Sequence, residues 1–357
     1  MRPIYTGDRI TTGVPLVRRA AQNIKVLFDE ARDIFAEAGC PSDDDGIVRL
    51  DPDVIAKALE SAPEDAGTTA KCCVGAASFT PVTQAHDPVE ERIPADVETV
   101  FDLQTHGPDV WVGQSPNYPW GRIFGGLVIA QALWAATQTI EQEHLLHSMH
   151  SYFILGGDPN EPVRYEVDRI RNGRSFSTRR VVARQSSGAI FNLSCSFQRH
   201  EDGVETQTAD FPADAPEPQT LDFFREGSGV DRFDVDLGDQ PRSLVWARFP
   251  GELADDPRVH LCALAYLSDT NAMDAVAHAH PRGIPETHDE WDQTYMSASL
   301  DHAMWFHRPV KANDWLLFDM DGHGILRTRG LTTGHVFAAN GEHIATIAQE
   351  GLIREVR

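Results

Sequence analysis

The sequence lacks any long apolar run and any apolar leader. No stretch approaches the ~20 consecutive apolar residues that a membrane-spanning helix needs, so the sequence predicts no membrane span. The first residues, MRPIYTGDRITTG, lack the apolar centre of a signal peptide. We therefore expect a cytoplasmic protein.

Basic residues are also scarce. Lys and Arg number 31 against 54 Asp and Glu, giving a formal net charge of −23, and only four of the basic residues are lysine. This balance argues against nucleic acid or an anionic membrane as a partner, since both reward positive charge. An anionic ligand would need a local basic patch, for which arginine is suited because its guanidinium grips a phosphate through two hydrogen bonds.

The cysteine pattern excludes two further classes. Five cysteines are scattered along the chain, and none forms a CxxC pair. The spacing is typical of reduced thiols in a cytosolic protein and offers no metal ligand set. The sequence therefore predicts no disulfide framework, no metal site and no cofactor.

Residues 1–97 differ from the rest and predict a small helical N-terminal extension with a linker. Apolar residues recur at helical spacing from Val14 to Ala38, and a second helix is expected over Asp53–Ser61, after Pro52. Residues 66–97 have little periodicity. Through DIFAEAG and RLDPDVIAKALESAP, residues 1–65 weakly resemble the N-terminal segment of trimethylamine-type methyltransferases, but the barrel that carries their chemistry is absent here.

Residues 98–200 read as a first repeat built from one buried helix and an antiparallel sheet. The helix expected over Leu127–Thr137 is apolar on nearly every side and must therefore be buried. Four strands follow, over residues 147–155, 163–171, 175–185 and 189–198. Segregated helix and sheet of this kind belong to the α+β class.

Residues 201–242 are predicted to be an acidic linker, and residues 243–357 a second repeat. Residues 201–240 hold 12 acids against two arginines, a composition too polar for a core. The second repeat predicts a strand over Leu244–Phe249, a helix from Pro257 to about Ala275, and strands over 297–307, 315–322, 325–337 and 343–353. Three matches relate the halves: Tyr152-Phe153 with Trp305-Phe306, 173–176 with 328–331, and Ser196 with Gln349.

Three polar residues in the second repeat interrupt faces that should be apolar. Asp269 is the single carboxylate of the buried stretch 260–269, which reads as helix, while Ser299 and Gln349 lie on strands of alternating pattern. Such interruptions often mark functional sites. Taken singly, Asp269 reads as a helix terminator and Gln349 as a solvent-facing strand residue. The first repeat has Leu146 and Ser196 at the positions matched to Ser299 and Gln349.

Several long motifs resemble the acyl-CoA thioesterase II family in order. The second repeat contains AYLSDTN, ASLDHAMWFHR and AQEGLIR, and the first contains GRIFGGLVIAQAL, HSMHSYF and RNGRSFSTRRVVARQ. The resemblance covers about residues 100–355. It implies a double hotdog fold, an acyl-CoA substrate, and hydrolysis of its thioester by a water that Asp269, Ser299 and Gln349 orient. It implies one active site per chain, in the second repeat, and allows a homo-oligomer.

Candidate substrate-binding residues are less specific. Gly125 and Gly126 at a helix start would let the backbone approach a ligand, although tight helix packing explains them equally. Arg174, Arg327 and Arg329 are candidates for the CoA phosphates, and alternate strand positions would put Arg327 and Arg329 on one face. For any single arginine a solvated surface is the ordinary explanation.

Two other functions remain open. Residues 268–274 partly match a hotdog enoyl-CoA hydratase pattern, but Asp274 stands where that pattern has its histidine. A non-catalytic acyl-CoA binding or sensing protein is the alternative of another class. Outside the three polar residues, His147 and His150 are secondary candidates for a general base because imidazole titrates near neutrality. His302 is expected to hydrogen-bond within a strand pair.

Overall fold

The computed structural model describes residues 24–25, 47–48, 100–238, 240–285 and 288–356. The chain divides into two compact units, 1–89 and 90–357. In the first unit, strand β1 (Ile24–Lys25) pairs antiparallel with β2 (Ile47–Val48). The helix predicted over Val14–Ala38 is therefore wrong at Ile24–Lys25, where pairing with a β-branched segment outweighs the helical spacing of apolar residues. The remainder of both predicted N-terminal helices lies outside the described residues.

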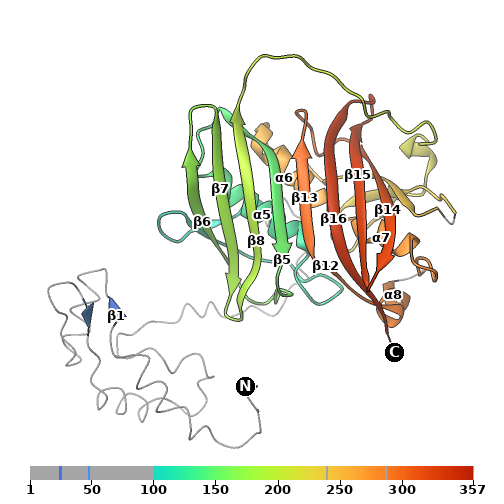
Figure 1. Ribbon diagram of the computed structural model, residues 1–357, viewed down its shortest axis with the longest axis horizontal. Coiled ribbons are helices and arrows are strands. Elements are labelled where there is room, and N and C mark those ends of the chain that lie inside the picture. The colour runs from blue at the N-terminus through green and yellow to red at the C-terminus, as the bar shows by residue number, and fades with distance from the viewer. Residues whose placement is uncertain (1–23, 26–46, 49–99, 239, 286–287, 357) are drawn as a thin grey trace, which may run out of the picture. The chain divides into compact units, whose positions relative to one another are not determined.

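The second unit is organised around one antiparallel sheet of 14 strands (Figure 1). The order across it is β3-β4-β6-β7-β8-β5-β13-β16-β15-β14-β11-β10-β9, and β12 also pairs with β16. The first-half strands are β3 (Gln104–Thr105), β4 (Val110–Gly113), β5 (His144–Phe153), β6 (Val163–Asn172), β7 (Phe176–Gln185) and β8 (Gly188–Arg199). The later strands are β9 (Phe224–Arg225), β10 (Asp231–Asp234), β11 (Arg242–Arg248), β12 (Tyr295–Ser299), β13 (Asp301–Phe306), β14 (Leu316–Leu326), β15 (Arg329–Ala338) and β16 (His343–Glu355).

The two halves repeat one plan about the pairing of β5 with β13. Outward from that pair, the strands follow in the order β5-β8-β7-β6-β4 on one side and β13-β16-β15-β14-β11 on the other. Each half also contains a register shift near the centre. Between β5 and β8 it falls between Leu146 and Ser148, and in the second half strand structure is interrupted at Leu300, between β12 and β13.

Aligning these two irregularities relates individual positions. Leu146 then matches Ser299, and Tyr152-Phe153 match Trp305-Phe306, as the sequence predicts. Cys195, rather than Ser196, occupies the position of Gln349. The burial pattern of residues 190–193 agrees with that of 344–347 in this frame. The predicted match of Ser196 with Gln349 is therefore off by one residue, which in a strand exchanges the two faces.

Helices cover one face of this sheet. They are α5 (Gly125–Thr137), α6 (Pro257–Leu267), α7 (Ala272–His278) and α8 (His288–Thr294). The long helices α5 and α6 pack against each other behind the sheet (Figure 1). Helix α5 is buried along nearly its whole length, because its residues are apolar on every side. Among the described residues, no helix is long and apolar enough to cross a membrane.

Several other local predictions differ from the structure. The acidic segment 201–242 contributes strands β9 and β10 to the sheet, and Val230 and Phe233 within it are buried. The strand predicted over 297–307 is divided at Leu300. The helix predicted from Pro257 to about Ala275 ends at Leu267 and resumes at Ala272. Its start is as predicted, with the Asp256 carboxylate accepting a hydrogen bond from the Arg258 N–H.

Candidate functional site

Asp269 lies in the break between helices α6 and α7. Side-chain hydroxyls on either side of it cap the preceding turn, since Ser268 Oγ donates to the Ala265 carbonyl and Thr270 Oγ1 to the Leu267 carbonyl. These bonds compete with continuation of the helix. The break presents the Asp269 carboxylate to the N-terminus of α5, where the Gly126 N–H donates to it. The positive end of the helix dipole favours a carboxylate at this place.

The two glycines that begin α5 have different reasons to be glycine. A Cβ on Gly126 would lie 2.4 Å from the backbone oxygen of Tyr266, so this residue is required by helix packing. A Cβ on Gly125 would lie 2.5 Å from Asp269 Oδ2 and 2.9 Å from the Phe153 ring. Because Gly125 has no Cβ, there is room for the Asp269 carboxylate at this position.

Ser299 and Gln349 meet Asp269 across the sheet. Ser299 Oγ donates to Asp269 Oδ1 at 3.4 Å, and Gln349 Nε2 donates to Ser299 Oγ at 2.9 Å. Ser299 ends β12 immediately before the interruption at Leu300, and Gln349 lies on the neighbouring strand β16. The structure thus brings together Asp269 from the break between two helices and Ser299 and Gln349 from two strands, although Asp269 and Gln349 are 80 positions apart in the sequence.

The environment of Asp269 changes its acidity. Burial raises the pKa of its carboxyl from 3.8 to about 7, and the negative charge of Glu226 contributes in the same direction. Hydrogen bonds from Gln349, the Gly126 N–H and Ser299 oppose this rise. A carboxyl with a pKa near neutrality can accept a proton from water far more readily than one at 3.8, which is what general base catalysis requires.

A pocket of about 410 Å³ opens onto these residues. Asp269 and Ser299 line it, while Gln349 lies behind them with no exposed surface. Its apolar walls come mainly from the first half of the chain, from Ile123, Phe124, Val128, Phe153, Ile190 and Phe191. The pocket therefore combines reactive groups of one half with apolar surface of the other.

Known proteins match both halves of the chain. The family model described as "Acyl-CoA thioesterase N-terminal domain" matches residues 114–198, and "Acyl-CoA thioesterase" matches 229–352. Acyl-CoA thioesterase 2 of Haemophilus influenzae is 34% identical over 269 residues, covering 69% of this chain and 92% of the relative. The chain belongs to the acyl-CoA thioesterase II family.

Solved structures agree with this membership. An acyl-CoA thioesterase II, TesB2, from Mycobacterium marinum matches with 36% identity and a TM-score of 0.63, covering 73% of this chain and 99% of that one. A protein of unknown function with a hot dog fold from Alicyclobacillus acidocaldarius matches with a TM-score of 0.60 at 18% identity, covering 73% and 98%. The second likeness concerns the fold alone, which is the hotdog fold.

Sequence reasoning missed two residues beside the site of this thioesterase-family chain. Arg232, in the segment predicted as a linker, is buried and donates to the Thr270 carbonyl at 2.9 Å and to Asp274 Oδ2 at 2.5 Å. It thereby fixes the loop that carries Asp269. Glu226 lines the pocket, and burial raises the pKa of its carboxyl to about 7. The sequence gives one signal for these two residues: Arg232 is one of few basic residues in an acidic segment whose composition predicts no core.

The structure separates other predicted residues from the pocket. His147 bonds Ser196 Oγ at 2.8 Å, His150 is exposed against the Trp305 ring, and neither histidine lines the pocket. Arg174 is exposed beyond the end of β6. The neighbouring Ser175 carbonyl accepts from the Arg199 N–H, and Arg199 pairs with His144 at the far end of β5 from Phe153.

The second-half arginines lie at the opposite end of the sheet from Arg174. The sequence predicts that Arg327 and Arg329 share one strand face, and this prediction is wrong. Arg327 has a φ of 52° and occupies the turn between β14 and β15. Arg329 is exposed and its Nε donates to Glu350 Oε1 at 2.8 Å. Neither lines the pocket, whereas Arg122 does, and its Nη2 donates to the Ser297 carbonyl at 3.0 Å.

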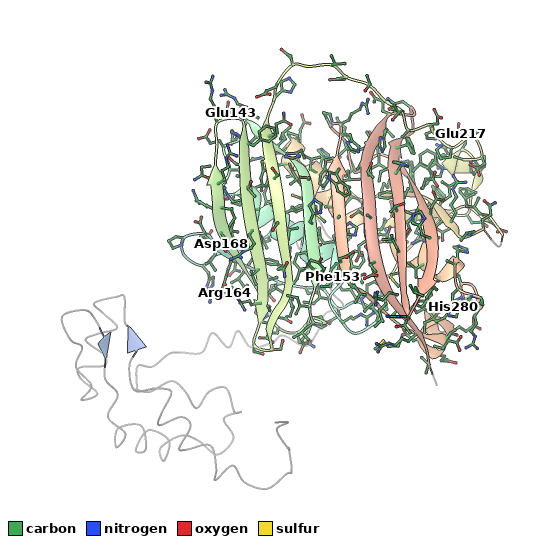
Figure 2. All side chains as sticks on the ribbon, in the orientation of Figure 1. Glu143, Phe153, Arg164, Asp168, Glu217 and His280 are labelled. Carbon is green, nitrogen blue, oxygen red and sulfur yellow. The ribbon has the colours of Figure 1, made fainter. Side chains whose placement is uncertain are left out.

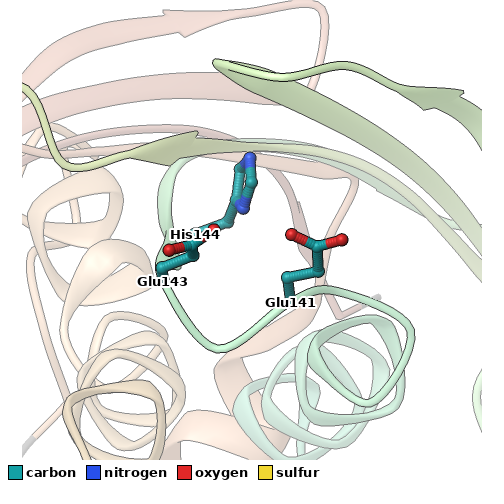
Figure 3. Close-up of side chains that lie close together, drawn as sticks. All are labelled: Glu141, Glu143 and His144. Atoms are coloured by element: carbon teal, nitrogen blue, oxygen red, sulfur yellow. The ribbon is translucent and has the colours of Figure 1, made fainter.

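A small acidic cluster lies away from the site. The ligand atoms of Glu141, Glu143 and His144 lie within 4.8 Å of one another (Figure 3). Glu143 Oε2 accepts from Arg199 Nη2 at 3.0 Å, so a cation already occupies part of this cluster. Figure 2 shows Glu143 and Phe153 toward opposite ends of the sheet, which separates the cluster from the pocket.

Proposed function

We propose that this protein hydrolyses acyl-CoA thioesters to a free acid and CoA, using a water activated by Asp269 and oriented with the help of Ser299 and Gln349. The observation that supports it is the convergence of a carboxylate of raised pKa, a hydroxyl and a side-chain amide beside a pocket with apolar walls. Relatives named acyl-CoA thioesterase support the same activity.

The reaction needs no covalent intermediate on the protein. The ionised Asp269 takes a proton from water while the water oxygen attacks the thioester carbonyl carbon. The carbonyl oxygen becomes an oxyanion, and the Gly125 N–H in the first turn of α5 is a donor that the helix itself leaves unused, while the Gly126 N–H bonds Asp269. Collapse of the tetrahedral species breaks the C–S bond, and the leaving sulfur takes up the proton that Asp269 received.

We further propose that each half of the chain is one hotdog unit, so that the chain is a double hotdog with a single active site. The repeated strand order about the β5–β13 pair supports this division. The first half has Leu146 and Cys195 where the second has Ser299 and Gln349, and its helix α5 contains no acid. The first half would then contribute apolar walls for the acyl chain.

The CoA group is proposed to extend from the pocket toward solvent. Arg122 lines the pocket, and Arg327 and Arg329 lie at the same end of the sheet, since the Thr328 carbonyl accepts from Ile353, the strand partner of the pocket residue Ser297. These three arginines are the proposed phosphate contacts. Arg174, at the other end, is the natural control.

The test is thiol release from a panel of acyl-CoAs that vary in chain length and branching, with the wild-type protein and with Asp269→Asn. Saturable release by the wild type and a loss of at least 100-fold in kcat for Asp269→Asn are expected. Asp292→Asn, which removes an exposed carboxylate from the same pocket, is the matched control. Release that is unchanged in Asp269→Asn would refute the mechanism. No release from any member of the panel, with the fold intact, would favour an acyl-CoA binding protein.

A further inference from the structure

A buried chain of hydrogen bonds continues from Gln349 away from the pocket. His302 Nδ1 bonds Gln349 Oε1, and His302 Nε2 bonds Ser268 Oγ at 2.8 Å. His302 and Gln349 have no exposed surface, and neither they nor Ser268 line the pocket. This series of hydrogen bonds ends at Ser268, the residue directly before Asp269. The contacts therefore form a closed path behind the site.

The donor and acceptor in each of these hydrogen bonds can be assigned by starting from Asp269. An ionised Asp269 and its partner Ser299 require a donor from Gln349, so the amide NH2 of Gln349 must face them and its carbonyl oxygen must face His302. That oxygen only accepts, so His302 Nδ1 must carry a proton. Burial lowers the pKa of His302 to about 4, which leaves a neutral ring with Nε2 as an acceptor. The single Ser268 hydroxyl proton, which also faces the Ala265 carbonyl at 2.8 Å, is then shared between the two acceptors.

The first half of the chain shows what the fold itself requires at these positions. Met149 and Cys195 are Cα partners on β5 and β8, and they occupy the places of His302 and Gln349 when the two halves are aligned at their irregularities. Both are buried and apolar. The first half, which has no site acid, therefore builds the same architecture with no polar pair at these two positions. A buried polar pair such as His302 and Gln349 is costly unless every polar group in it is hydrogen-bonded.

We infer that His302 is a positioning residue for the hydrolysis: its Nδ1–H fixes the Gln349 amide so that the NH2 group faces Ser299 and Asp269. This inference rests on the proposed function. If His302 were absent, the amide could rotate and present its oxygen to the carboxylate, which would repel it. The water would lose one of the groups that orient it, and Asp269 would lose a bond that favours its ionised form.

A purely structural role for the His302 side chain is the competing explanation. The strand contact at this place uses the backbone, since Ser151 Oγ donates to the His302 carbonyl at 2.9 Å. Any residue at position 302 keeps that bond. The role of the side chain can therefore be separated from that of the strand by three substitutions.

The substitutions differ in which nitrogen of the ring they imitate. His302→Asn places an amide NH2 near the position of Nδ1, so it can still donate to Gln349. His302→Gln reaches instead toward the position of Nε2 and Ser268, and leaves Gln349 without its donor. His302→Met introduces the residue that the first half has at this position. Arg122, Glu226, Asp274 and Asp292, the charged groups around Asp269 in the pocket, are unchanged in every variant.

The measurements are kcat and KM against pH with one acyl-CoA that the wild type hydrolyses, and the thermal midpoint. For His302→Met and His302→Gln we expect kcat to fall at least 10-fold, with KM within 3-fold, and the acid limb of kcat to move upward by about half a pH unit or more. His302→Asn should stay within about 3-fold of wild type in kcat and keep the wild-type acid limb. Equal losses in His302→Asn and His302→Gln, or wild-type behaviour of His302→Met, would overturn the inference.

A measurement on the wild-type protein keeps the inference testable if variants unfold. In ¹⁵N-labelled protein at pH 7, His302 should be the neutral tautomer with the proton on Nδ1. A proton on Nε2, or a doubly protonated ring, would overturn it. Failure of the proposed function is distinguishable, because it would appear as an inactive wild type or an active Asp269→Asn variant, whatever the tautomer of His302.

Discussion

Gly125 and Asp269 lie so close that a Cβ on the glycine would come within 2.5 Å of the carboxylate oxygen Oδ2. Gly125→Ala should therefore displace the Asp269 carboxylate from Ser299 and from the Gly126 N–H. We expect kcat for thioester hydrolysis to fall roughly 10–100-fold, in the range that misplacement of a catalytic group by about 1 Å produces.

Gly156→Ala is the matched control for this change. Gly156 also lines the pocket, but its Cβ would meet nothing closer than the Arg122 side chain at 3.9 Å. This variant should keep near-wild-type kcat. If Gly125→Ala were as active as Gly156→Ala, the carboxylate could lie elsewhere without loss, and the geometry described for Asp269 would not matter to the reaction.

The raised pKa of Asp269 predicts opposite pH effects on activity and stability. Activity should rise with pH through about 7, because the reaction uses the ionised carboxylate. The free energy of unfolding changes in the opposite direction, because folding raises the pKa of Asp269 from 3.8 to about 7. The contribution of this group to stability is fully present below pH 3.8 and is lost as the pH rises through 7. A tenfold change in proton affinity corresponds to ~1.4 kcal/mol, so the effect is at most about 4 kcal/mol.

Asp269→Asn should therefore unfold at a higher temperature than wild type at pH 8, and the difference should shrink at pH 5. Thermal unfolding of both proteins at the two pH values measures it. Asp292→Asn, an exposed position in the same pocket, should show no such pH-dependent difference. An equal or lower unfolding temperature for Asp269→Asn at pH 8 would contradict a buried, poorly solvated carboxylate.

Part of the fold and of the candidate site could be predicted from the sequence. Alternation along the strands and the all-round apolar helix at Leu127–Thr137 were sufficient, because these patterns record which faces are buried. The break at Asp269 could not be predicted in the same way. Apolar spacing continues through residues 261–276, and only the hydroxyl caps of Ser268 and Thr270 interrupt the helix.

The contribution of Arg232 was hidden for a different reason. It lies in a segment, 201–240, that holds 12 acids against two arginines, a composition that indicates a solvated linker. In the structure one of these acids and one distant acid neutralise a buried guanidinium, with Asp234 Oδ1 at 2.5 Å and Asp274 Oδ2 at 2.5 Å. A composition argument cannot detect this, because Asp274 is 42 positions away along the chain.

Arg232→Ala should be strongly destabilising. It would leave the carboxylates of Asp234, Asp274 and Glu226 facing one another without their shared cation, a change that typically costs about 3–5 kcal/mol. Denaturant unfolding measures the loss. Arg225→Ala is the control, because Arg225 is half-exposed and its partner Asp231 keeps Arg248, so a loss of no more than about 1 kcal/mol is expected. Similar losses for both variants would show that burial of Arg232 adds nothing.

Arg122 predicts a change in substrate binding rather than in chemistry. It is an exposed cation in a pocket whose other charged groups are carboxylates, and CoA is an anion. Arg122→Ala should raise KM for an acyl-CoA several-fold and leave kcat within about 2-fold, with a smaller effect at high salt because exposed charges are screened. Arg174→Ala, at the other end of the sheet, should leave both constants unchanged. A larger effect from Arg174→Ala than from Arg122→Ala would place CoA on the opposite end of the molecule.

Glu226 predicts a shift of the activity profile without loss of the reaction. Its charge raises the pKa of Asp269, so Glu226→Gln should lower that pKa and move the acid limb of kcat/KM to lower pH, by some tenths of a unit to one unit. Glu217→Gln, an exposed change away from the pocket, is the control (Figure 2). A limb that stays in place would mean that Glu226 is uncharged where Asp269 titrates. A limb that moves upward would show that a second carboxylate assists ionisation of the first, which is opposite to the sign expected for two like charges in one pocket.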